Sequence, residues 1–178
     1  MKSDRNILGL CGSLRRTSSN KSLLEAARLL APDGVTLTLY EHLGDLPAFN
    51  PDIADDAQPQ SVTDFRAALA RADAVIISSP EYVHSLPGSL KNALDWLVGT
   101  SDLVDKPVTL FNASPRATYA VAALNEILTV MSGRLVSGAS VTLQLSGREL
   151  DAAGIVADEA FSAEIRRGLN ELLKTIDT

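Results

Sequence analysis

Short apolar segments alternate with helix-like patterns along most of the chain. The apolar segments are rich in β-branched residues and are bounded by Gly, Pro, Asp or Ser, which is typical of buried strands. We expect one strand at each of five such segments. These are Ile7–Leu10, Val35–Tyr40, Ala74–Ser79, Val108–Ala113 and Ser140–Leu143.

Between these segments, apolar residues recur three or four positions apart, as they do on one face of a helix. One helix is expected to begin at Pro87 and to run to about Val98, before Gly99 ends it. The last helix is expected from Asp158 to about Ile176, with its apolar side chains facing the core. The other helical faces are formed by Leu23, Leu24, Ala27 and Leu30, by Phe65, Ala68, Leu69 and Ala72, and by Val121, Leu124 and Leu128.

Alternating strands and helices predict an α/β fold, in which helices cover both faces of a parallel sheet. Five strands fit a doubly wound, flavodoxin-like sheet of order 2-1-3-4-5. That order places a ligand outside the carboxyl ends of strands one and three, so we expect a site formed by the loops after strands one, three and four. The segment Glu41–Gln60 is too long for a simple link, and we interpret it as either functional or mobile.

The segment 6–20 joins the first strand to the first helix through a turn rich in hydroxyl side chains. Backbone N–H groups at the start of a helix point at a bound anion, and the helix dipole favours negative charge there. A Walker-type loop would place Lys and then Ser or Thr after its last Gly, but Gly12 is followed by Ser-Leu-Arg. A dinucleotide fingerprint needs three spaced glycines, and only Gly9 and Gly12 are present. The turn therefore predicts a site for one phosphate monoester, with an ordinary capped helix as the alternative.

The bulk composition narrows the class of protein and its partners. The 178 residues fit one domain, spanning 1–178. A formal charge of −6 gives no basic surface for nucleic acid or a membrane, and we expect neither a leader nor a membrane span. The single cysteine, Cys11, excludes an intrachain disulfide and fits a reducing, cytoplasmic location. We interpret Cys11 as a small buried side chain, because no histidine close in sequence could activate it as a nucleophile.

Two motifs resemble those of the NADPH-dependent FMN reductase family, which comprises flavodoxin-like enzymes that include quinone, chromate and azo-dye reductases. The first motif is Gly-Ser-Leu-Arg-x-x-Ser-x-Asn at positions 12–20. The second joins Pro-Glu-Tyr at 80–82 to Ser-x-Pro-Gly-x-Leu-Lys-Asn-Ala-Leu-Asp-Trp at 85–96. With further similar residues at 46–52 and 113–115, the resemblance covers roughly the first 115 positions.

The resemblance implies FMN as cofactor and NADPH or NADH as electron donor. It implies that the turn after the first strand holds the FMN phosphate, that the loop after the third strand lines the isoalloxazine ring, and that Ser114 caps the pyrimidine end of this ring. The residues implied for the phosphate are Ser13, Arg15, Ser18 and Asn20, and those implied for the ring are Pro80, Glu81, Tyr82 and Val83.

The chain departs from the family pattern at Val83, where the family usually has Asn, and at His84, where a small residue is common. A side-chain contact of that Asn with the flavin would be lost here, whereas a backbone contact would survive. The resemblance also implies a homodimer or homotetramer. Lys91, Asn92, Asp95 and Trp96 lie on a predicted helix, and we do not interpret them as catalytic. We interpret Trp96 as packing, in the core or in a subunit contact, together with Leu90, Ala93, Leu94 and Leu97.

With FMN bound, hydride would pass from the nicotinamide to flavin N5 and then to a second substrate. The expected reaction is a ping-pong reduction of quinone, flavin, azo or metal-oxyanion acceptors in one open site. This step needs no acid, base or metal, so we expect no metal site and interpret His42 and His84 as exposed loop residues. Arg116 is a candidate for stabilising reduced flavin near its pyrimidine or for binding the NADPH 2′-phosphate, and Arg15 and Arg16 are rivals for the second role.

Two other classes of function stay open at this point. A flavodoxin-type electron carrier would cover the flavin and exchange single electrons with a protein, but the longer motif favours the reductases. The other class is a flavin-free protein that binds another phosphorylated ligand, and the change at Val83 lends it some support. The sequence does not distinguish a quinone or chromate reductase from an enzyme that supplies reduced FMN to a partner monooxygenase.

Overall fold

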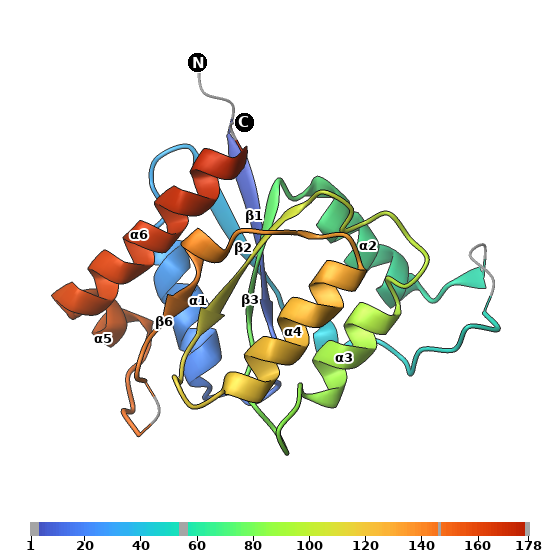
Figure 1. The fold of residues 1–178 in the computed structure, drawn as a ribbon, viewed down its shortest axis with the longest axis horizontal. Helices are drawn as coiled ribbons and strands as arrows, with labels where there is room; N and C mark the ends of the chain where they lie inside the picture. Colours follow the sequence, from blue (N-terminus) through green and yellow to red (C-terminus); the bar gives the residue numbers. More distant parts are fainter. Residues whose placement is uncertain (1–3, 54–56, 146, 177–178) are drawn as a thin grey trace.

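A single parallel sheet forms the centre of the computed structural model, which describes residues 4–53, 57–145 and 147–176 (Figure 1). Its strands follow the order β2-β1-β3-β4-β5, and β6 also pairs with β4. This confirms the predicted flavodoxin-like order. The strands are β1 (Arg5–Cys11), β2 (Val35–Tyr40), β3 (Ala74–Ser78), β4 (Pro107–Asn112), β5 (Arg134–Leu135) and β6 (Val141–Thr142).

The fifth position of the sheet is shared by two short strands. β5 pairs with the start of β4 and β6 pairs with its end, and the 3-10 helix η3 (Ser137–Ala139) lies between them. The strand predicted at Ser140–Leu143 corresponds to β6. β5 was not predicted, because two residues, one of them an exposed arginine, are too few to form an apolar pattern.

Helices cover both faces of the sheet (Figure 1). One face carries α1, α5 and α6, and the other carries α2, α3 and α4. The last helix begins one residue after its predicted start, whereas α3 is shorter than predicted, with Pro87 as its N-cap and Trp96 as its C-cap. The bounds are α1 (Ser19–Leu29), α2 (Gln60–Arg71), α3 (Gly88–Asp95), α4 (Thr118–Val130), α5 (Ala152–Ala157) and α6 (Glu159–Ile176).

Two interior strands, β3 and β4, are buried along their whole length, as expected for a parallel sheet covered on both sides. Alternate side chains of β1 enter opposite cores. Leu8 and Leu10 pack with the α2, α3 and α4 side, while Ile7 and Cys11 pack with the α1 and α6 side. The carboxyl ends of β1, β3 and β4 are thereby held side by side.

α6 packs unusually closely against the split fifth position of the sheet. A Cβ atom added at Gly168 would lie 2.5 Å from Val141 Cγ2 and 2.8 Å from the Ala139 carbonyl oxygen, so only glycine allows this approach. The neighbouring Arg167 donates hydrogen bonds to the carbonyls of Gly138 (2.6 Å) and Ser140 (2.5 Å). These contacts fix η3 and β6, and through them the end of β4.

Residues 47–49 of the long segment after β2 contact α3 and its C-cap through hydrogen bonds and aromatic packing. The Pro47 carbonyl accepts hydrogen bonds from Asn92 Nδ2 (2.9 Å) and Trp96 Nε1 (2.8 Å), and Phe49 packs edge-to-face on Trp96. Trp96 is 2% exposed, so it lies in the core. Residues 54–56 of this segment lie outside the described part of the chain.

Within the described residues, no helix has the combination of length and apolar character that crossing a membrane would require.

Candidate functional site

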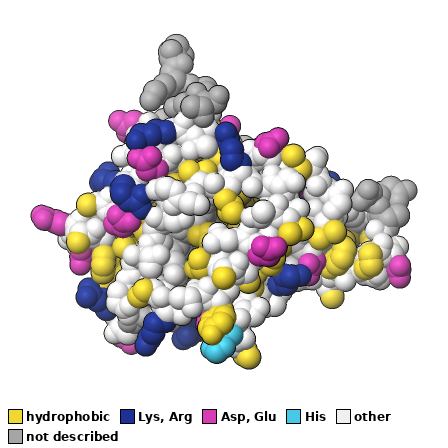
Figure 2. Space-filling view, viewed as in Figure 1, with side chains coloured by type: hydrophobic (Ala, Val, Ile, Leu, Met, Phe, Trp, Pro, Cys, Tyr) yellow, Lys and Arg dark blue, Asp and Glu magenta, His cyan; other side chains and the backbone are white. Residues whose placement is uncertain are grey.

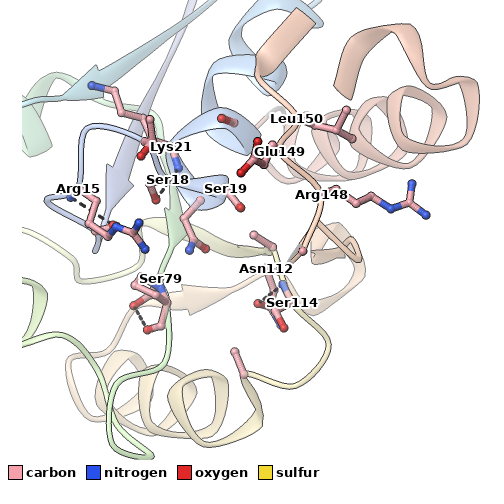
Figure 3. Close-up of a pocket in the computed structure, with 18 of the residues that line it drawn as sticks. Arg15, Ser18, Ser19, Lys21, Ser79, Asn112, Ser114, Arg148, Glu149 and Leu150 are labelled. Carbon is pink, nitrogen blue, oxygen red and sulfur yellow. Dashed lines mark hydrogen bonds between the residues drawn. The ribbon is translucent and has the colours of Figure 1, made fainter. Parts of the chain in front are cut away.

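A cavity of about 1080 Å³ opens at the carboxyl ends of β1, β3 and β4 (Figure 3). Three of its walls are the predicted loops: residues 13–22 after β1, 79–82 after β3, and residues from 112–117 after β4. Its fourth wall, residues 147–152, was not predicted. Nine of the ten predicted site residues line this cavity: Ser13, Arg15, Ser18, Asn20, Pro80, Glu81, Tyr82, Ser114 and Arg116.

The turn after β1 presents hydroxyl groups and helix N–H groups to the cavity. Ser18 is the N-cap of α1, and its Oγ accepts a hydrogen bond from the Lys21 N–H (3.4 Å). Ser19 and Asn20 occupy the first turn of α1, where backbone N–H groups have no acceptor within the helix. The Arg15 side chain has no partner among the described residues and lines the same cavity. This donor set suits an anion.

The turn after β1 can lie this close to β3 because Gly12 has no side chain. A Cβ atom at Gly12 would be 2.7 Å from Ser79 Oγ, and the Gly12 N–H donates to the Ser78 carbonyl (2.9 Å). Ser78 Oγ in turn donates to Asn20 Oδ1 (2.9 Å). Two hydrogen bonds therefore join the turn after β1, together with the start of α1, to the end of β3.

Glu81 connects the loop after β3 to the first turn of α4. Its Oε2 accepts hydrogen bonds from the backbone N–H groups of Tyr119 (2.8 Å) and Ala120 (3.0 Å). A carboxylate at a helix N-terminus is stabilised both by these donors and by the helix dipole. The Glu81 side chain thus caps α4, and it holds Pro80 and Tyr82 at the cavity wall.

A tight two-residue turn follows Tyr82. Tyr82 and Ser85 exchange backbone hydrogen bonds of 3.0 Å in both directions, and the residues between them, Val83 and His84, have φ values of 50° and 54°. This is the geometry of a type I′ turn, which strongly prefers Asn-Gly. Val83 is 100% exposed at the tip and does not line the cavity, so the structure does not bring it together with the other predicted residues.

His84 stacks on Tyr119 of α4, with ring centroids 4.2 Å apart and planes inclined by 17°. Figure 2 shows a histidine among hydrophobic side chains at the lower edge of the molecule, where Figure 1 places the loop after β3. The loop is therefore tied to α4 at two points, by the Glu81 carboxylate and by the His84 ring.

The loop after β4 folds back on itself at the cavity wall. Asn112 Oδ1 accepts a hydrogen bond from the Ser114 N–H (3.2 Å), and Ser114 Oγ accepts one from the Arg116 N–H (3.3 Å). Figure 3 shows Asn112 and Ser114 joined in this way on one side of the cavity. Sequence reasoning selected Ser114 and Arg116 but missed Asn112.

The fourth wall comes from the chain that leads into α5. Asp151 is the N-cap of α5, and its Oδ1 accepts from the Gly154 N–H (2.8 Å). In Figure 3, Glu149 lies toward Ser19 of α1, whereas the Arg148 side chain extends away from the cavity, where its guanidinium lies 5.3 Å from the Phe161 ring centroid. The Asp-x-x-Gly pattern was the available sequence signal for this cap, but it does not reveal that the wall faces α1.

Cys11 lies next to the site without lining it. Its Sγ donates to the Ser13 carbonyl (3.6 Å), and burial raises the pKa of the thiol above its usual range. The side chain is therefore held as a protonated, packed group, in agreement with the sequence interpretation. Within the described ranges, no group of three or more His, Cys, Asp or Glu residues is placed to hold a metal ion.

The chain is similar to known proteins both in sequence and in fold. The sequence model of the NADPH-dependent FMN reductase family matches residues 5–146. A subunit of an NADH:(hydroxy)cinnamate reductase from Vibrio ruber is 37% identical over 166 residues, which are 90% of this chain and 81% of that protein. A quinone reductase from Pseudomonas putida is 41% identical over 109 residues, which are 60% of this chain and 58% of that protein.

A solved structure with a similar fold is the flavoenzyme NAD(P)H:(acceptor) oxidoreductase FerB from Paracoccus denitrificans. It superposes with a TM-score of 0.85 at 30% sequence identity and covers 97% of each chain. The structural likeness thus extends over nearly the whole chain, whereas the family match ends at residue 146, before the fourth wall of the cavity at residues 147–152.

The left-handed conformation of Val83 generates a prediction about stability. Val83→Asn should raise the free energy of unfolding by about 1 kcal/mol, because Asn tolerates this conformation better than a β-branched residue and a fully exposed side chain loses no packing. Urea denaturation measures the change. Val130→Asn, at a 74% exposed valine at the end of α4, is the control and should change stability little. Equal effects of the two substitutions would contradict the assignment of strain to the turn.

Proposed function

Because the chain belongs to the NADPH-dependent FMN reductase family, and is thus an oxidoreductase that uses FMN with a nicotinamide donor, we propose that one open site serves two substrates in turn. With FMN bound, the cavity would admit NADPH or NADH first and, once the oxidised nucleotide has left, a small acceptor in its place, in a ping-pong sequence. The observation that carries this proposal is the cavity itself, because it gathers nine predicted residues from three separate loops. When bound, FMN supplies the hydride-accepting and hydride-donating atom N5.

The donor set of the turn after β1 fits the phosphate of FMN. Ser13 and Ser18 contribute hydroxyl groups, α1 contributes the N–H groups of its first turn, and Arg15 contributes a guanidinium. A phosphate monoester held by hydroxyls, amides and one arginine needs no metal ion. We assign Ser13, Arg15, Ser18 and Asn20 to this role.

The loop after β3 is proposed as the wall against the isoalloxazine ring. Pro80 and Tyr82 line the cavity, Tyr82 is 46% exposed, and Glu81 fixes both by capping α4. Val83 points outward at the tip of the turn, so the contact we propose is made by residues 80–82 without its side chain. Ser114, on the opposite loop, is assigned to the pyrimidine end of the ring.

The acceptor is proposed to be a small molecule that can stack on an open flavin. The Pseudomonas putida relative is a quinone reductase, which supports a quinone as the acceptor. The Vibrio ruber relative is a subunit of a (hydroxy)cinnamate reductase, which supports a (hydroxy)cinnamate as a second candidate. Free flavin, azo dyes and metal oxyanions are the other candidates. We further propose a homodimer or homotetramer on the basis of family membership, and a cytoplasmic location because the single cysteine fits a reducing compartment.

The first test is reductase activity of the purified protein. With FMN added, the protein should turn yellow, and the flavin should bleach under anaerobic conditions on addition of NADPH or NADH. Steady-state oxidation of the nucleotide with a quinone should give parallel double-reciprocal plots, as a ping-pong reaction requires. Absence of bleaching with both nucleotides would refute the proposal and favour an electron carrier.

The assignment of Arg15 predicts a selective loss of affinity. A hydrogen bond to a charged group contributes about 1.5–3 kcal/mol, so Arg15→Ala should raise the Kd for FMN about 10-fold or more. The Kd for riboflavin, which lacks the phosphate, should change little, and fluorescence quenching measures both. Arg71→Ala, at the end of α2, is the matched control and should leave both values unchanged. Equal losses for FMN and riboflavin would contradict a phosphate role.

Arg116 is proposed to stabilise negative charge on the reduced flavin or to bind the NADPH 2′-phosphate, because it lines the cavity directly after Ser114. Arg116→Ala should therefore lower the midpoint potential of bound FMN or reduce the preference for NADPH over NADH. Arg116→Lys, which keeps the charge, should retain most of the potential but less of a bidentate phosphate contact. If Arg116→Ala changes neither the midpoint potential nor the nucleotide preference, the proposed role of Arg116 is wrong.

A further inference from the structure

Four of the polar side chains that line the cavity are almost fully buried, and together they are called its floor below. Ser13, Asn20, Ser79 and Asn112 line it with exposures of 8%, 8%, 7% and 8%. Buried polar groups are costly unless they are hydrogen-bonded, and a flat aromatic ring would pack better on apolar side chains. The floor is therefore suited to a ligand part that is rich in oxygen.

Asn112 is the most informative of these four residues. The Ser114 N–H can only donate, so the atom of the Asn112 amide that it meets must be the oxygen, and this fixes the orientation of the amide. Asn112 Nδ2 has no hydrogen bond to any described residue. Since no fully buried side-chain nitrogen or oxygen in the described ranges lacks a partner, Nδ2 must reach the open space of the cavity.

Asn20, in the first turn of α1, repeats this arrangement. Its Oδ1 accepts from Ser78 Oγ, which leaves its own Nδ2 as the remaining amide donor beside the cavity. Each asparagine thus has its oxygen engaged by the protein and its two N–H donors left for a ligand.

The position of Asn112 is also firmly held. Its carbonyl accepts a hydrogen bond from the Leu143 N–H (2.8 Å), and its Cα pairs with Thr142 of β6. α6 fixes β6 in turn through the close approach at Gly168. A donor held this rigidly loses little conformational entropy when a ligand binds.

We propose that Asn112 is an FMN-binding residue whose Nδ2 donates to an oxygen of the FMN tail, either a ribityl hydroxyl or the phosphate, in concert with Asn20. This inference rests on the proposed function. It adds to the site a residue from the end of β4 itself, where the resemblance of sequence had offered only the loop that follows.

Asn112→Asp separates the proposed role from a purely structural one. The Asp carboxylate can still accept from the Ser114 N–H, so the turn after β4 is preserved, but the donor facing the cavity becomes a negatively charged acceptor. The apoprotein carrying this substitution should bind FMN at least 10-fold more weakly than the unaltered apoprotein, as measured by calorimetry or flavin fluorescence. Asn125→Asp, on the exposed side of α4, adds the same charge away from the cavity and should bind FMN normally.

The binding of riboflavin and lumiflavin, two flavins with shorter tails, identifies which oxygen of FMN Asn112 contacts. Loss of affinity for riboflavin as well as FMN assigns the contact to the ribityl chain, and loss for FMN alone assigns it to the phosphate. Lumiflavin, which has neither, should bind the variant and the unaltered protein equally. An equal loss for lumiflavin, or an unchanged Kd for FMN, would overturn the proposal. Failure of the unaltered protein to bind FMN would instead refute the proposed function, so the two failures are distinguishable.

Discussion

The hydrogen bond from the Gly12 N–H to the Ser78 carbonyl holds the site together. It continues the pairing of β1 with β3 beyond the last residue of β1, and it brings the turn after β1 to the floor of the cavity. The missing side chain at Gly12 makes room for Ser79, and the Ser78 hydroxyl then reaches Asn20. Without this junction, the turn after β1 and the loop after β3 would be two separate surface features.

The fold was largely predictable from sequence, and the site only in part. Strands such as β3 and β4 are apolar throughout because both faces are covered, and hydroxyl-rich capping of α1 is a local signal. The sequence did not reveal Asn112, because its importance depends on which amide atom faces Ser114. The wall at residues 147–152 was missed because only the packing of α5 against α1 brings it to the cavity.

Val83 shows a different limit of sequence reasoning. The motif around it places residues 80–83 next to each other in the chain, but the left-handed backbone at Val83 turns that side chain outward. A family that usually has Asn at this position uses the residue that the turn prefers. The loop is held against α4 by the Glu81 cap, which belongs to the shared motif, and by the stacking of His84 on Tyr119, which involves one of the two residues that depart from the pattern.

The burial of Cys11 has a chemical consequence for an enzyme that handles oxidants. Quinones and peroxides modify cysteine by reaction with the thiolate, so the hazard depends on how much of that ion is present and whether a reagent can reach it. Here Cys11 is 9% exposed, its Sγ donates a hydrogen bond to the Ser13 carbonyl, and burial raises the pKa of the thiol. Cys11 is therefore poorly suited to react with electrophilic compounds, although it lies only two residues from Ser13 in the cavity wall.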